Sequence, residues 1–139
     1  MHNVKQDGIV VAQYVKKRMG FSSKIIVHGI SLGGAVASHI ARKGLCDFLV
    51  CDRTFGSLSE VPRAMLGAWA TVGLKSLFEW STDNTEDFYN SYCYKIIATD
   101  PNDEIISDGS SMKTMISKLI IQKEKNHMNL STRVMGSLY

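Results

Sequence analysis

The sequence predicts an α/β protein in which short buried strands alternate with helices. Three runs of apolar, β-branched residues have the length of buried strands, and helical patterns separate them along the chain. Strands that alternate with helices are typical of a mostly parallel sheet with helices on both faces. With 139 residues, of which 45% are hydrophobic and 21% charged, the whole chain (1–139) has the size and balance of a single globular domain.

The first half of the chain predicts a helix, a strand and a second helix. Apolar residues recur at helical spacing over Asp7–Arg18, and Gly20 stands where a C-terminal cap belongs. The run Lys24–His28 is short, apolar and β-branched, which indicates a buried parallel strand. The segment Leu32–Lys43 is rich in small residues at helical spacing and ends at Gly44. A strand therefore turns sharply into a helix.

The second half of the chain repeats this alternation. A second buried strand is predicted over Phe48–Asp52 and is followed by a long helical region at about 61–80. The third strand is Tyr94–Ala98, and the turn Asp100–Asp103 comes directly after it. A last helical pattern occupies Met112–Ile121. No internal repeat or interdomain linker interrupts the chain.

Charge, cysteine content and hydropathy exclude several classes of protein. The formal charge of +3 is scattered rather than gathered into a run, so nucleic acid is not an expected partner. Cys46, Cys51 and Cys93 are odd in number and lack metal-ligand spacing, which argues against a disulfide framework or a metal site and favours a reducing compartment. The polar start and the lack of about 18 consecutive apolar residues predict a cytoplasmic location.

The pentapeptide Gly29-Ile30-Ser31-Leu32-Gly33 lies between a predicted strand and a predicted helix. In a strained strand-to-helix turn the residues flanking the serine come close together, which predicts glycine at Gly29 and Gly33, with Gly34 where the helix approaches the strand. Such a nucleophile elbow exposes the Ser31 hydroxyl, and the backbone N–H of Leu32 would be an oxyanion donor. The alternative interpretation is a glycine-rich turn that only packs tightly and holds a phosphate at the helix N-terminus.

Three stretches together resemble a known superfamily: IIVHGISLGGAVASHIA, CDRTFGSL and YKIIATDPNDEII. They are similar to the α/β-hydrolase superfamily, and most similar to its ABHD-like serine hydrolases, over about four fifths of the chain. The resemblance implies a partial α/β-hydrolase fold in which the N-terminal strands before the elbow are missing. It also implies a small-molecule or lipid-like acyl substrate, with no cofactor and no metal.

The same resemblance places the acid of a catalytic triad at Asp103, in the loop after the third strand. Asp52 is the rival acid because it ends the strand after the elbow helix, although an aspartate beside an arginine is more typical of a turn and ion pair. His127 is the candidate base, because the order Ser31, Asp103, His127 is that of the family. The two histidines nearest to the elbow, His28 and His39, are better explained as structural residues.

The predicted function is that of a serine hydrolase that cleaves an ester, a thioester or an amide through an acyl-enzyme intermediate. Residues 61–92, which are rich in aromatic side chains, would form a cap or helical insertion and the acyl-binding wall, although those aromatics are equally compatible with core packing. The alternative is a non-catalytic subunit of a larger assembly. A sheet of three parallel strands leaves open edges, which a homo-oligomer or hetero-oligomer would cover.

Overall fold

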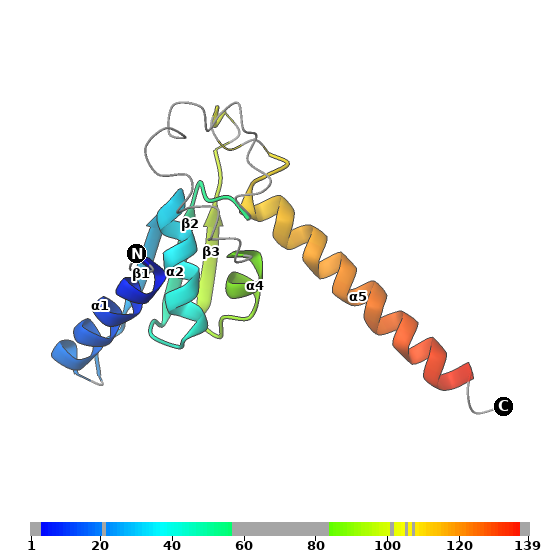
Figure 1. Ribbon diagram of the computed structural model, residues 1–139, viewed down its shortest axis with the longest axis horizontal. Helices are drawn as coiled ribbons and strands as arrows, with labels where there is room; N and C mark the ends of the chain where they lie inside the picture. Colours follow the sequence, from blue (N-terminus) through cyan, green and yellow to red (C-terminus); the bar gives the residue numbers. More distant parts are fainter. Residues whose placement is uncertain are drawn as a thin grey trace.

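The computed structural model describes residues 4–20, 22–56, 84–100, 102–104, 106 and 108–136, with side chains as far as residue 126. Figure 1 shows the strands side by side, a group of helices beside them and a long helix that extends away. The elements in chain order are α1 (Val4–Met19), β1 (Ile26–Ile30), α2 (Leu32–Arg42), β2 (Phe48–Asp52), α4 (Asn84–Tyr89), β3 (Tyr94–Ala98) and α5 (Met112–Gly136).

The three strands form a parallel sheet in the order β1-β2-β3. The register aligns Ile26 with Phe48 and Phe48 with Tyr94, so the carboxyl ends of the strands meet at one edge. The second and third strands have their predicted bounds, and the first begins two residues later than predicted. The α/β class is therefore confirmed for the described chain.

The core lies between the sheet and α2. Leu49 and Cys51 of β2 are fully buried and pack with Ala37 and Ala41 of α2. Small side chains on this face of α2 let the helix approach the strands closely. The buried Phe88 of α4 belongs to the same cluster, so this aromatic of the predicted insertion is a core residue. Residues 61–83 of that insertion lie outside the described chain.

The described helices pack on one face of the sheet. The expectation of helices on both faces stays a prediction, because the helix predicted at about 61–80 lies outside the described residues. Alternate residues of each strand point away from α2. Four large apolar side chains on that opposite face are exposed: Ile26, Ile30, Tyr94 and Ile96. The strand before the elbow, β1, pairs only with β2 among the described strands, so it forms one edge of the described sheet.

The last helix is longer than the sequence pattern predicted. Met112 at its start is fully buried in the core, and from there α5 extends away from the sheet (Figure 1). The prediction ended this helix near Ile121, where the apolar pattern fades. Residues 113–135 contain neither glycine nor proline, so nothing in the backbone chemistry ends the helix before Gly136.

Candidate active site

Ser31 occupies the single residue between β1 and α2 and has a strained backbone. Its φ is 52° and its ψ is −118°, a combination that residues with a side chain rarely adopt. A strained residue of this kind costs on the order of 1–3 kcal/mol and persists only where its surroundings hold it. The Ser31 N–H donates to the carbonyl of Asp52 over 2.9 Å, and the Gly34 N–H donates to the carbonyl of Ser31 over 3.1 Å. These bonds fix the turn at both ends.

The hydroxyl of Ser31 does not cap the helix that follows it. Ser31 stands at the N-cap position of α2 but makes no capping hydrogen bond with its side chain. The N–H of Leu32, the first residue of α2, has no acceptor among the residues that the structure describes. The turn thus presents a side-chain hydroxyl and, on the next residue, a backbone donor.

Two of the three glycines of the motif permit close backbone packing. A Cβ on Gly29 would lie 2.6 Å from the Cα of Gly34, and a Cβ on Gly34 would lie 2.7 Å from the Cβ of Thr54. Both distances are shorter than atoms tolerate. Gly33 differs, because no described atom lies within 4 Å of a Cβ built there. The expectation that Gly33 must be glycine for steric reasons is therefore wrong, since its side-chain direction points outward from the turn.

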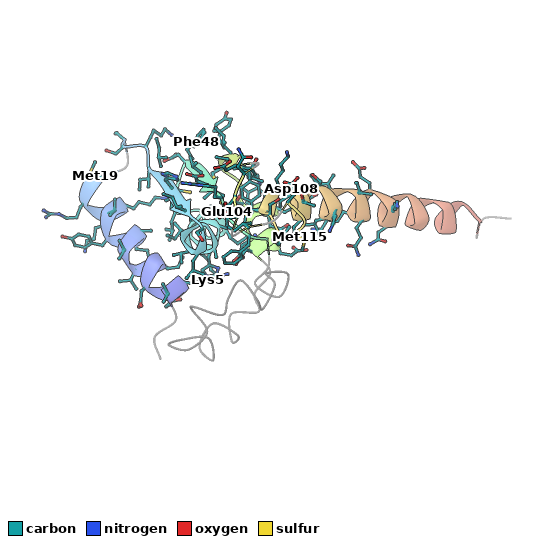
Figure 2. All side chains as sticks on the ribbon, turned by 90° about the horizontal axis from the view of Figure 1, so that it is seen from above. Lys5, Met19, Phe48, Glu104, Asp108 and Met115 are labelled. Carbon is teal, nitrogen blue, oxygen red and sulfur yellow. The ribbon has the colours of Figure 1, made fainter. Side chains whose placement is uncertain are left out.

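Ser31 and Asp103 line the same pocket, which has a volume of about 370 Å³. The pocket lies at the carboxyl ends of the strands, where open parallel sheets place their ligand sites. Its other lining residues are Ile30, Arg53, Asp100, Glu104 and Ile106. Figure 2 looks down on the molecule from above, and its labels for Glu104 and Asp108 mark the loop between β3 and α5. The nucleophile and the acid proposed from the sequence thus share one cavity.

The position of Asp103 is set by hydrogen bonds within its own loop. Its N–H donates to the carbonyl of Asp100 over 3.2 Å, and its Oδ1 accepts the N–H of Ile106 over 2.9 Å. The Oδ1 of Asp100 in turn accepts the N–H of Asn102 over 2.9 Å. Aspartate and asparagine commonly form such local turns. The Asp103 carboxylate is half-buried and held at the wall of the pocket.

Asp52, the rival acid, is engaged in ion pairs. Its Oδ1 accepts the Nε of Arg53 over 3.2 Å, and its Oδ2 lies 3.7 Å from the Nε2 of His28. This is the turn and ion-pair role that the sequence favoured. His39 is also occupied elsewhere, because its Nδ1 lies 3.0 Å from a carboxylate oxygen of Asp87 between α2 and α4.

His127 lies within α5, beyond Ile121, where the predicted helix ended. Helical rise places residue 127 about 22 Å along the axis from Met112, and the start of α5 is tied to the body by the Met112 N–H, which donates to the carbonyl of Thr54 over 2.8 Å. The side chain of His127 is outside the described residues. The structure therefore brings Ser31 and Asp103 together, and it does not bring the backbone of His127 to them.

Arg53 is a pocket residue that the sequence reasoning missed. It follows β2 directly and has a φ of 44°, and its N–H donates to the carbonyl of Ala98 over 2.9 Å. Because β2 ends at the same edge of the sheet as β1, the position of Arg53 directly after β2 could have indicated that it lines the pocket. The guanidinium adds one positive charge to a pocket that three carboxylates also line.

Comparison of the chain with models of protein families, with curated proteins and with solved structures found no match. Within the described ranges, no helix has the length and apolar character needed to cross a membrane. The same part of the chain contains no group of three or more histidine, cysteine, aspartate or glutamate side chains arranged to hold a metal ion.

Proposed function

We propose that this protein is a serine hydrolase of the α/β-hydrolase type that cleaves an ester, a thioester or an amide. One observation carries the proposal: Ser31 is held at φ 52° between a parallel strand and a helix, beside a pocket that Asp103 also lines. A strained serine at such a turn exposes its hydroxyl above the sheet. The glycines at 29 and 34, which the close packing requires, are the part of the motif that supports an elbow rather than an ordinary loop.

The proposed reaction passes through an acyl-enzyme. Ser31 Oγ attacks the substrate carbonyl carbon while a histidine accepts its proton, and the N–H of Leu32 stabilises the negative charge that develops on the carbonyl oxygen. The histidine then gives the proton to the leaving oxygen, sulfur or nitrogen as the bond to carbon breaks. Water attacks the acyl-enzyme by the same route and releases the acid. Asp103 would orient the histidine and stabilise its charged form.

The base of the proposed triad is His127, by its order in the chain after Ser31 and Asp103. For His127 to act, its side chain must reach the pocket from α5, so the proposal requires an arrangement of α5 that differs from the extended one in Figure 1. His28 is nearer along the chain, but it lies beside Asp52 rather than in the pocket lining. Separate mutation of His127 and of His28 can therefore show which of the two histidines is the base.

The pocket supports a small-molecule acyl substrate. Its volume of about 370 Å³ falls within the range of small-ligand sites. Ile30 and Ile106 supply the apolar part of the cavity lining, which would accommodate a short acyl chain. A lipid-like acyl group would need additional wall, which the proposed insertion at 61–92 would supply. The proposed chemistry requires neither a cofactor nor a metal, and the proposed location is the cytoplasm.

A fluorophosphonate probe tests the proposal, because the reagent requires both an activated hydroxyl and oxyanion donors. We expect labelling of the folded full-length chain at Ser31, confirmed by peptide mapping, and loss of labelling in Ser31→Ala. Ser117→Ala is the matched control, since Ser117 is an exposed serine on α5. Labelling that Ser31→Ala leaves unchanged, or none at all in a folded preparation, would reject a hydrolase.

A non-catalytic subunit of a larger assembly is the second candidate function. Four exposed apolar side chains on the uncovered sheet face favour it: Ile26, Ile30, Tyr94 and Ile96. Parallel sheets in other proteins are covered on both faces. Sedimentation of the purified chain tests it, with self-association or aggregation expected from the wild type and suppressed in Ile26→Lys. A wild-type chain that is monodisperse and monomeric would contradict this candidate.

A further inference from the structure

Two cysteine thiols that are distant in the sequence meet at the amino end of the sheet. The Sγ of Cys46 lies 3.9 Å from the Sγ of Cys93, and both thiols are free and half-buried. A disulfide bond is about 2 Å long, so rotation of the side chains has to close a gap of only about 2 Å. The pair lies outside the Ser31 pocket and takes no part in the proposed hydrolysis.

The parallel pairing of β2 and β3 explains why these two residues meet. Cys46 lies two residues before β2, and Cys93 immediately precedes β3. The register aligns Phe48 with Tyr94, and the Tyr94 N–H extends the ladder by donating to the carbonyl of Asp47 over 3.3 Å. Parallel strands begin at the same edge, so the two segments that lead into them are neighbours. Cys46 and Cys93 are far apart in the sequence and meet only because β2 pairs with β3, so their spacing in the sequence does not indicate a disulfide.

A small reagent can reach the pair, because both thiols are partly exposed. Cys46 and Cys93 both pack at the margin of the core cluster that contains Ala37 and Ala41 of α2. Burial, with the neighbouring Cys93 next in importance, raises the pKa of Cys46 to about 12. A thiol with so high a pKa is a poor first nucleophile, so the first attack on a reagent is expected from Cys93.

We propose that Cys46 and Cys93 form a thiol–disulfide exchange site that accepts a small disulfide of the oxidised-glutathione class. The Cys93 thiolate attacks one sulfur of the small disulfide, which forms a mixed disulfide and releases one small thiol. Cys46 loses its proton to solvent and attacks the Cys93 sulfur, which forms the intramolecular bond and releases the second small thiol. Two protein thiols are oxidised by two electrons, and one small disulfide is reduced to two thiols.

Cys51 provides the internal control. It is fully buried in the core, where its thiol lies 3.4 Å from the Ser38 hydroxyl and 3.8 Å from the Gly34 carbonyl, and burial raises its pKa to about 11. These neighbours of the Cys51 thiol are a hydroxyl and a carbonyl rather than another thiol. Cys51 should therefore stay reduced while the other two cysteines react.

The test uses the full-length chain, reduced, freed of reductant and incubated with oxidised glutathione. We expect the intact mass to fall by that of two hydrogen atoms, the count of titratable thiols to fall from three to one, and a peptide map to join Cys46 to Cys93. Cys46→Ser should stop at a mixed disulfide with one glutathione on Cys93. Cys51→Ser should behave as the wild type.

A second readout follows from the chain that the bond encloses. The disulfide would close the chain from residue 46 to residue 93 into a loop, which restricts the unfolded state. The oxidised wild type should therefore melt about 5 °C or more above the reduced one. Cys46→Ser should show no such difference after the same treatment. Wild-type protein that keeps three thiols, stops at a mixed disulfide, or links only between molecules or through Cys51 would overturn the proposal.

Discussion

Gly34 lies against Thr54 so closely that even a methyl group on Gly34 would overlap the threonine side chain. A Cβ at this position would stand 2.7 Å from Thr54 Cβ, and Thr54 is itself fully buried. This contact joins the start of α2 to Thr54, the second residue after the end of β2, and it sets how near the elbow lies to the sheet.

Gly34→Ala should therefore destabilise the protein by about 1–3 kcal/mol, because a buried neighbour must move. Gly33→Ala is the matched control in the same helical turn. No described atom approaches a Cβ at Gly33, and alanine favours a helix over glycine, so this change should alter the free energy of unfolding by less than about 1 kcal/mol. Urea titration of both variants measures the difference. Equal effects would mean that Thr54 does not limit the turn.

Ser31→Gly should stabilise the fold while it abolishes activity. Glycine adopts φ 52° without the steric cost that serine bears, so the free energy of unfolding should rise by up to about 1 kcal/mol. Ser31→Ala retains the strain and should match the wild type in stability. Thermal unfolding separates the two variants, and a destabilised Ser31→Gly would show that the elbow is not strained.

Asp103→Asn should reduce turnover by on the order of a thousandfold with little change in stability. An amide cannot orient and charge-stabilise the histidine, yet its oxygen still accepts the N–H of Ile106. Asp52→Asn is the control, because it weakens the pairs with Arg53 and His28 and should cost less than about 1 kcal/mol while it leaves turnover near normal. Steady-state kinetics with a chromogenic ester decides between the two acids.

His127→Gln tests the base directly. If His127 reaches Ser31 in the working protein, this change should lower turnover by on the order of a thousandfold, whereas His28→Gln should leave it almost unchanged. Both variants keep a polar side chain of similar size. The reverse pattern would assign the base to His28 and would remove α5 from the mechanism.

Asp87→Asn should destabilise the junction of three helices. Its Oδ2 lies 3.2 Å from the ammonium of Lys5, which is 5% exposed, and 3.0 Å from His39 Nδ1. Removal of a carboxylate from a buried ion pair costs about 2 kcal/mol or more. Lys24→Gln removes a comparable but exposed pair with Asp47 and should cost less than about 1 kcal/mol. Chemical denaturation of the two variants gives the comparison.

Local patterns of residues were enough to predict the strands, the strand-to-helix turn at Ser31 and the turn that contains Asp103. Each of these features depends on neighbours in the chain: β-branched runs predict β2 and β3, glycine spacing predicts the turn at Ser31, and an Asp-rich turn predicts the loop of Asp103. The long α5 was underestimated because its apolar periodicity fades, although no glycine or proline breaks it before Gly136.

Only the tertiary structure decided which of these residues meet. Parallel pairing places the ends of β1 and β2 at one edge, which brings Arg53 into the pocket of Ser31 and occupies Asp52 in ion pairs. The same pairing brings the thiols of Cys46 and Cys93 close together at the opposite edge. Such contacts depend on strand register and helix packing, and these are set by the summed burial of distant segments, which no local pattern records.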